Sequence, residues 1–263
     1  MEIFLPLALG MMTGLLLGLT GAGGGILAAP LLVLIMHLPV TQAAPASLIA
    51  VFIGASVGAV LGLREGIVRY KAAMLMAVTG LLAFPLGHAL VHYLPNTLLI
   101  MLFVLLLGYQ AWRSWQGSAT TADDTQPCDV STTSGRFIWT QPCALAFTRS
   151  GLAAGFLSGL LGVGGGFILV PALRRYTPLE THSITATTLL VLALVSCGGF
   201  LQWSVGGGVA WKIAIPFAAG AAFGMVCGRE FSPKLEEHLL RRIFAVLCGT
   251  IGLSLLVKLA ISI

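Results

Sequence analysis

The sequence predicts an all-α integral membrane protein built from two homologous repeats in inverted orientation. Three observations support this prediction: the composition, an internal repeat and the distribution of basic residues. Hydrophobic residues make up 57% of the 263 residues and charged residues only 9%, whereas soluble chains average about 25% charged residues. So few charges could not cover the surface of a soluble globule. The composition therefore excludes a soluble enzyme, a nucleic-acid-binding module and a disordered chain.

Six apolar segments are long enough to cross a bilayer as single helices, because a helix needs about 20 apolar residues to span about 30 Å. Two longer apolar stretches, residues 3–36 and 144–173, are each interrupted by a glycine cluster. The first cluster reads Gly18-Leu-Thr-Gly-Ala-Gly-Gly-Gly25, and the second reads Gly159-Leu-Leu-Gly-Val-Gly-Gly-Gly166. The six predicted single spans are residues 43–63, 72–94, 97–112, 183–203, 211–228 and 239–260.

The two halves of the chain are copies of one unit, related by an offset of 141 residues (155 − 14). The register holds without a gap from the pair Gly14 and Gly155 to the pair Gly108 and Gly249, a run of about 95 residues. An ordered run of this length does not arise by chance. We therefore predict an N-terminal transmembrane repeat over residues 1–112, a polar cytoplasmic linker over 113–143 and a C-terminal transmembrane repeat over 144–263.

The basic residues decide how the repeats are oriented. If each glycine-interrupted stretch crossed the membrane once, the 14 lysines and arginines would divide eight to six, with no bias. If each stretch turns back as a re-entrant helix pair, twelve lie on one side and only Lys212 and Lys258 on the other. The second pattern is the one that the positive-inside rule expects. Two complete passes per stretch would give the same division, but the 11-residue leg 26–36 would reach only about 16 Å as a helix.

The glycine clusters are the predicted binding elements. Each glycine weakens a helix by about 1 kcal/mol relative to alanine, so three in a row mark a break. New half-helices then begin near Gly25 and Gly166, with unpaired N–H groups at the positive end of the helix dipole, which favours an anion. The structural alternative is that the glycines allow close helix packing. The predicted substrate-binding glycines are Gly21, Gly23, Gly24, Gly25, Gly162, Gly164, Gly165 and Gly166.

Hydroxyl groups near the starts of the next helices complete the predicted site. Ser47 in the first repeat aligns with Thr188 in the second, and Thr187 lies beside it. Neutral hydroxyl donors can hold an anion, although such groups also commonly bond to the backbone of their own helix. Lys71 and Lys212 either draw anions into vestibules or extend toward lipid headgroups.

No residue spacing in the chain suggests catalysis, a metal site or a cofactor site. No carboxylate lies in the middle of a predicted span, which argues against a carboxylate proton relay. His88 lies inside an apolar run and could titrate near neutrality or simply hydrogen-bond between helices. His182 opens a helix just after two arginines. The five cysteines are expected to be small packing residues, although Cys128 and Cys143 flank a loop and could pair.

The repeated motifs resemble the TauE/SafE family of probable sulfite exporters, within the four-TMS-type sulfur permease superfamily. The resemblance implies a multi-pass permease of the bacterial inner membrane that moves sulfite or a small organosulfur anion. The chain departs from its own repeat where Thr41-Gln-Ala-Ala44 replaces His182-Ser-Ile-Thr185. The resemblance rests on Gly18 to Pro30, Gly159 to Pro171, Ala46-Ser47-Leu48, Thr187-Thr188-Leu189, and the stretches Gly66 to Lys71 and Gly207 to Lys212.

We therefore expect a membrane permease, not an enzyme, that works by alternating access and holds its anion at the glycine-broken helix tips. The expected partners are a small anionic substrate and the lipid bilayer, with no nucleic acid and no cofactor; the sequence leaves open a homo-oligomer. Two alternatives remain. One is a permease for another small anion, and the other is a membrane-embedded thiol or redox protein using Cys197, Cys227 or Cys248.

Overall fold

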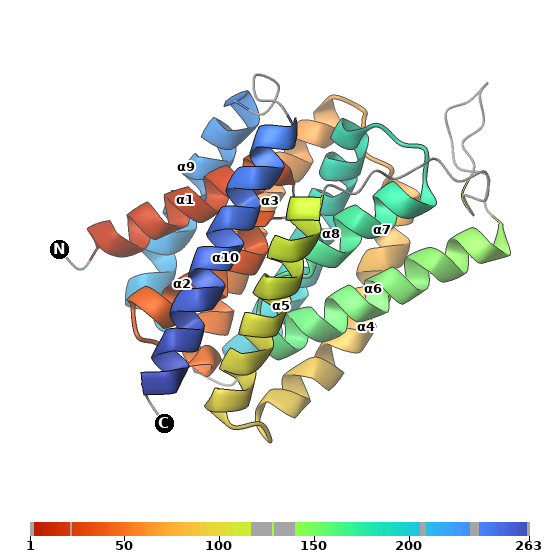
Figure 1. The fold of residues 1–263 in the computed structure, drawn as a ribbon. Helices are drawn as coiled ribbons and strands as arrows, with labels where there is room; N and C mark the ends of the chain where they lie inside the picture. The colour runs from red at the N-terminus through yellow and green to blue at the C-terminus, as the bar shows by residue number, and fades with distance from the viewer. Residues whose placement is uncertain are drawn as a thin grey trace.

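The computed structural model describes residues 3–21, 23–116, 128, 140–205, 209–231 and 237–261. Within these residues every regular element is an α-helix, as the sequence predicted (Figure 1). The first repeat contains α1 (Phe4–Thr20), α2 (Gly23–Ile35), α3 (Val40–Arg64), α4 (Tyr70–Val91) and α5 (Asn96–Gln116). The second contains α6 (Gln141–Leu161), α7 (Gly166–Tyr176), α8 (Thr181–Val205), α9 (Trp211–Phe231) and α10 (Glu237–Ile261).

Seven of the described helices are long and apolar enough to cross a membrane. Six of them, α3, α4, α5, α8, α9 and α10, correspond to the predicted single spans. The seventh is α6, which belongs to a glycine-interrupted stretch and begins earlier than that stretch. Its early start has a local cause, because Thr140 caps the helix by accepting a hydrogen bond from the Cys143 N–H, and Pro142 lies in the first turn.

Both glycine-interrupted stretches form helical hairpins. Gly21 ends α1 with φ 75°, and Gly162 ends α6 with φ 68°, backbone angles that glycine adopts without steric cost. The chain then turns back: a Cβ on Gly24 would collide with the Thr13 carbonyl of α1, and one on Gly165 would lie 2.6 Å from the Ala154 carbonyl oxygen of α6. The position of these hairpins within a membrane stays a prediction.

The helix bounds of the two halves follow the sequence offset. Helices α3 and α8 differ by 141 residues at both ends (181 − 40 and 205 − 64), and the starts of α4 and α9 differ by the same number (211 − 70). Helices α3 and α8 also pack against each other in opposite directions, because Gly58 faces Leu189 while Gly62 faces Ala186. Opposite directions for equivalent, neighbouring helices are what inverted repeats require.

Each hairpin packs on the fourth helix of the other half: α1 lies along α9, and α6 lies along α4 (Figure 1). Glycines allow these close approaches. A Cβ on Gly14 would collide with the Ala221 carbonyl, and one on Gly155 would collide with the Gly80 carbonyl. For these glycines outside the two clusters, close helix packing is therefore the role that the structure gives.

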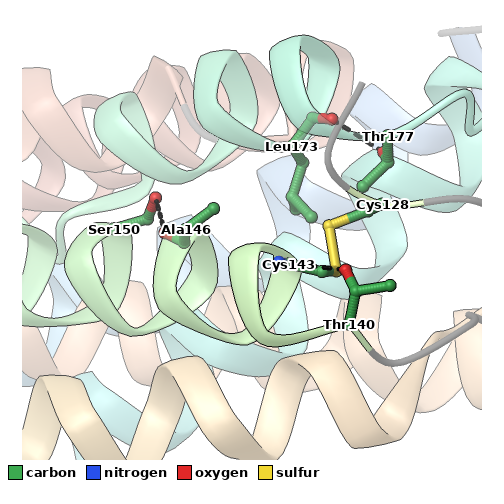
Figure 2. Close-up of a disulfide and its surroundings, with 7 residues drawn as sticks. All are labelled: Cys128, Thr140, Cys143, Ala146, Ser150, Leu173 and Thr177. Carbon is green, nitrogen blue, oxygen red and sulfur yellow. Dashed lines mark hydrogen bonds between the residues drawn. A yellow bond between two sulfur atoms is a disulfide. The ribbon is translucent and has the colours of Figure 1, made fainter. Parts of the chain in front are cut away.

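The expectation that all five cysteines are packing residues was wrong for two of them. Cys128 and Cys143 form a disulfide, with Cα atoms 4.9 Å apart, while Cys197, Cys227 and Cys248 are free. Figure 2 shows the disulfide beside the end of α7, where the Thr177 hydroxyl donates to the Leu173 carbonyl. The disulfide ties one point of the predicted linker to the start of α6. Most of the linker, residues 117–127 and 129–139, lies outside the described residues.

Candidate functional site

A cavity of about 490 Å³ opens among helices from both repeats. Gly18, Thr20 and Gly23 of the first hairpin reach the cavity surface. Apolar side chains of α7, α8, α9 and α10 form much of the wall. The lining residues are Gly18, Leu19, Thr20, Gly23, Gln110, Arg113, Ser114, Phe167, Val170, Pro171, Arg174, Glu180, Thr181, His182, Thr185, Ala186, Leu189, Met225, Arg229, Leu240, Arg241 and Phe244.

Four arginines from four different helices line this cavity: Arg113 of α5, Arg174 of α7, Arg229 of α9 and Arg241 of α10. A guanidinium group stays charged at any physiological pH. Glu180 is the single acidic residue among the described lining residues. A concave surface with this excess of positive charge concentrates anions.

Arg229 also joins two helices at the edge of the cavity. Its Nη1 donates to the Gly58 carbonyl at 2.9 Å, and its Nη2 donates to a carboxylate oxygen of Glu65 at 2.6 Å. The Arg229 side chain is 15% exposed. Part of its charge is therefore balanced by Glu65, so that Arg229 fixes α9 to α3 while it faces the cavity.

The arginines are the functional residues that the sequence prediction missed. The prediction used Arg113, Arg174, Arg229 and Arg241 only to assign the sides of the membrane. The sequence did contain one indication of their role. In the inverted topology all four arginines lie on the same side of the membrane, near the ends of helices. Without the packing, nothing in the sequence distinguishes Arg174 and Arg241 from their exposed neighbours Arg175 and Arg242.

The first glycine cluster contributes one predicted residue, Gly23, to the cavity wall. The Gly23 N–H donates to the Thr20 hydroxyl at 2.7 Å, so its backbone donor is already capped. Gly21 turns the chain beside Thr185, whereas Gly24 packs against α1. Gly25 points toward the second hairpin, where a Cβ would lie 3.0 Å from the Val163 carbonyl oxygen.

The second cluster is buried behind the first and does not line the cavity. Gly162 lies beside Ala44, and Gly164 has Val51, Leu192 and Ser196 around it. Val51 also contacts the position of Gly25, so one side chain packs against both tips. The structure thus brings the two glycine turns together, but it covers Gly162, Gly164, Gly165 and Gly166 with protein atoms.

The three predicted hydroxyl residues are fully buried and bonded to backbone groups. Ser47 donates to the Gly162 carbonyl at 2.6 Å, which fixes the second glycine turn to α3. Thr187 accepts the Arg69 N–H at 3.0 Å, and Thr188 donates to the Ile184 carbonyl at 2.8 Å. None of the three lines the cavity. Thr188 bonds within its own helix, as the structural alternative stated, whereas Ser47 and Thr187 bond to backbone groups outside their own helices.

The segment without a match in the first repeat does line the cavity, through His182 and Thr185. The segment in which the two halves differ in sequence therefore lies at the cavity wall. Lys71 and Lys212 are exposed and lie outside the cavity, as expected for side chains that extend to a membrane surface. Among the described residues, no group of three or more His, Cys, Asp or Glu could hold a metal ion.

Comparison with known proteins identifies the family. The family model for the sulfite exporter TauE/SafE matches residues 6–255. The chain belongs to the TauE/SafE family. Proteins of this family with similar sequences are described as membrane transporters, so the chain is a multi-pass membrane transporter rather than an enzyme.

Curated relatives of this TauE/SafE transporter come from bacteria and archaea. A probable membrane transporter protein of Xylella fastidiosa is 27% identical over 249 residues, which cover 94% of this chain and 92% of the relative. The probable membrane transporter protein YdhB of Bacillus subtilis is 26% identical, with 92% and 96% covered. One from Methanocaldococcus jannaschii is 26% identical, with 97% and 96% covered. No solved structure matches the chain.

Proposed function

We propose that this transporter moves small sulfur-containing anions, such as sulfite, thiosulfate or an organosulfonate, across the bacterial inner membrane. The observation that carries the proposal is the cavity lined by Arg113, Arg174, Arg229 and Arg241, whose wall also includes Gly23 of the first hairpin. Guanidinium groups bind oxyanions through paired N–H donors. The arginines collect the anion, and the turn at Gly23 lies at the end of its path.

The predicted glycine site belongs to a later step of the same path. In this proposal the anion passes from the cavity to the backbone N–H groups of the two glycine clusters when the hairpins separate. Two observations support the step: Gly25 lies against Val163 of the other hairpin, and Val51 packs against both turns. Binding at the junction of two broken helices is a common design of transporters built from inverted repeats.

The charge distribution supports a cavity that opens to the cytoplasm. All four cavity arginines belong to the twelve basic residues on the predicted cytoplasmic side. An inside-negative membrane potential favours export of an anion by about 2.3 kcal/mol per charge per 100 mV. An exporter loaded from the cytoplasm therefore needs no coupled ion.

The cavity is large and partly apolar, which supports transport of organic sulfur anions as well as inorganic ones. Its 490 Å³ lies within the range of about 300–1,000 Å³ found for small-molecule sites. Phe167, Leu189 and Phe244 would contact the apolar part of an organosulfonate. The same features also suit a small organic anion without sulfur, which is the second candidate cargo.

Flux through reconstituted liposomes tests the proposal. We expect saturable movement of at least one of sulfite, thiosulfate, sulfate and taurine. Movement of the three inorganic anions should be faster when the potential drives them outward, whereas taurine, a zwitterion without net charge near neutral pH, should not respond to the potential. Protein-free liposomes provide the background. Saturable flux of a carboxylate with none of the four sulfur compounds would favour the second candidate. No saturable flux of any anion would refute the proposal.

The proposed orientation can be measured at two residues toward opposite ends of α5, Gln116 at its end and Tyr93 in the turn before its start. Gln116 and Tyr93 are both exposed, and in the proposed topology they face opposite sides. We expect Gln116→Cys to react with a membrane-impermeant thiol reagent only in inside-out vesicles, and Tyr93→Cys only in right-side-out vesicles. Both variants lack Cys197, Cys227 and Cys248. The reverse pattern, or the same pattern for both variants, would contradict the proposed topology.

The disulfide gives this measurement a second readout. Stable disulfides are rare in the cytosol, so the Cys128–Cys143 disulfide of the structure counts against a cytoplasmic linker. The proposed topology requires that the pair is instead a dithiol in growing cells. Alkylation during cell lysis, followed by mass spectrometry, measures the oxidised fraction. A mostly oxidised pair, together with reaction of Gln116→Cys in right-side-out vesicles, would place the linker outside.

Replacing the three free cysteines by serine should leave transport within about twofold of the parent protein. Cys248 is fully buried, and Cys197 and Cys227 are partly buried and do not line the cavity. Initial rates in liposomes, normalised to the amount of folded protein, measure the effect. Loss of flux in a correctly folded triple variant would favour the thiol or redox alternative instead.

A further inference from the structure

The cavity has an equivalent region in the other repeat, and that region is closed. Three half-buried cavity residues, Thr185, Arg174 and Leu240, correspond through the offset of 141 to Ala44, Val33 and Leu99 (185 − 44, 174 − 33 and 240 − 99). The exposed fractions of Ala44, Val33 and Leu99 are 0%, 2% and 1%. The structure is therefore open at one set of equivalent positions and tightly packed at the other.

The positions equivalent to the cavity arginines carry no arginine, and the charge nearest to Val33 is Lys258, whose Nζ donates to the Val33 carbonyl at 2.8 Å. The positions of Arg113, Arg174 and Arg241 are taken by Ser254, Val33 and Ile100. Arg229 corresponds to His88 (229 − 88 = 141). His88 therefore replaces the one cavity arginine that joins two helices, and it is the only basic side chain among these four equivalents.

A pair of unpartnered ring nitrogens lies in this closed region. The rings of His88 on α4 and Trp203 on α8 stand edge to face, with centroids 4.4 Å apart. The Nδ1 of His88 and the Nε1 of Trp203 are buried, and neither has a hydrogen-bond partner among the described residues. Trp203 is only 5% exposed. An indole N–H can only donate, and a buried donor without an acceptor is costly and uncommon.

The surroundings of the pair place it beside the second hairpin. A Cβ on Gly159 of α6 would lie 3.0 Å from the His88 backbone nitrogen. Gly159 is the equivalent of Gly18, which lines the open cavity. The two unpartnered ring nitrogens thus occupy the place in the closed region that corresponds to the edge of the open cavity.

We infer that the anion leaves through a second vestibule, closed in this structure, which opens around Val33, Ala44 and Leu99 and binds oxyanions through His88 and Trp203. This inference rests on the proposed transport function. When the arginine-lined cavity closes, the equivalent helices of the other repeat separate. The Trp203 N–H then gains the oxygen acceptor that it lacks here, and the His88 ring in its Nδ1–H form donates to the same anion. Because this vestibule carries no arginine at the equivalent positions, it holds the anion less tightly than the cytoplasmic cavity and acts as the release side.

Thiol accessibility tests the vestibule without any cargo. Val33→Cys is compared with Val191→Cys, a substitution of the same kind at a residue of matching burial (2% and 1% exposed). Neither Val191 nor its equivalent Ala50 lines the cavity. In protein without the three free cysteines, we expect an anionic membrane-impermeant methanethiosulfonate to modify Val33→Cys at least tenfold faster than Val191→Cys in right-side-out vesicles. Equal rates would overturn the inference while leaving the flux assay, and the proposed function, unaffected.

The role of the ring pair is tested by Trp203→Phe, which keeps an aromatic side chain and removes the N–H. Trp211→Phe is the control, because Trp211 is 50% exposed and lies outside both regions. The substrate is whichever of the four sulfur compounds gives the highest flux. We expect Trp203→Phe to raise the KM for entry from the outer face about tenfold, because one hydrogen bond to a charged group is lost. The KM at the cytoplasmic face should change less than twofold. A Trp203→Phe protein indistinguishable from Trp211→Phe would overturn this role.

Discussion

The double substitution Arg174→Gln with Arg241→Gln should raise the KM for transport from the cytoplasmic face by about 100-fold. Each arginine lines the cavity from a different helix, and loss of one hydrogen bond to a charged group reduces affinity about tenfold. Glutamine keeps a similar length and polarity but removes the positive charge. The effect should weaken at high ionic strength, because salt screens the attraction between the cavity and the anion. Initial rates in liposomes, measured against substrate concentration, give the KM.

The matched control is Arg175→Gln with Arg242→Gln. These arginines are the sequence neighbours of the first pair, but they are exposed and do not line the cavity. The control removes the same net charge from the same two helices, so it measures the effect of net charge alone. If both double variants raise the KM equally, the cavity arginines have no special role in binding.

The substitution Gly165→Ala should destabilise the protein by about 2–5 kcal/mol. Two costs combine at this position. Gly165 has φ 71°, where an L-residue loses about 1–2 kcal/mol, and its Cβ would lie 2.6 Å from the Ala154 carbonyl oxygen, which adds an overpacking cost of about 1–3 kcal/mol. The second hairpin would then fail to close on itself. The melting temperature in detergent, together with the yield of monodisperse protein, measures the loss.

Gly66→Ala separates the two costs. Gly66 has a nearly identical φ of 70°, but a Cβ there meets nothing within 4 Å. It should therefore lose only the backbone cost, about 1–2 kcal/mol, and keep its transport activity. Equal losses for the two variants would mean that packing at the hairpin contributes nothing, which would contradict the tight contact between the glycine turn and α6.

The local features of the fold could be predicted because each depends on residues close together in the chain. The apolar segments 43–63 and 183–203 predicted helices that the structure extends to α3 (Val40–Arg64) and α8 (Thr181–Val205). The glycine clusters predicted two breaks, and both became hairpin turns. The extra length of α6 was missed, because it depends on the cap at Thr140.

The candidate site was predicted only in part, because several predicted hydrogen-bonding groups are already bonded to other groups of the protein. Ser47 was a reasonable anion donor in the sequence, yet its hydroxyl bonds to Gly162, a residue 115 positions away. Gly23 was predicted for its free N–H, but Thr20 caps it. The pairing of Cys128 with Cys143 was one of two open possibilities until their Cα atoms were found 4.9 Å apart.

The sequence by itself determined the class of the protein, the repeat, the helix breaks and the family, since composition, periodicity and glycine content act through local backbone and solvent preferences. Only the tertiary structure decided which polar groups face a cavity. Arg174 and Arg175 are adjacent in the same helix, yet one lines the cavity and the other is exposed. That difference arises from where α7 packs against its neighbours, and contacts between helices far apart in the chain are not encoded in any single local segment.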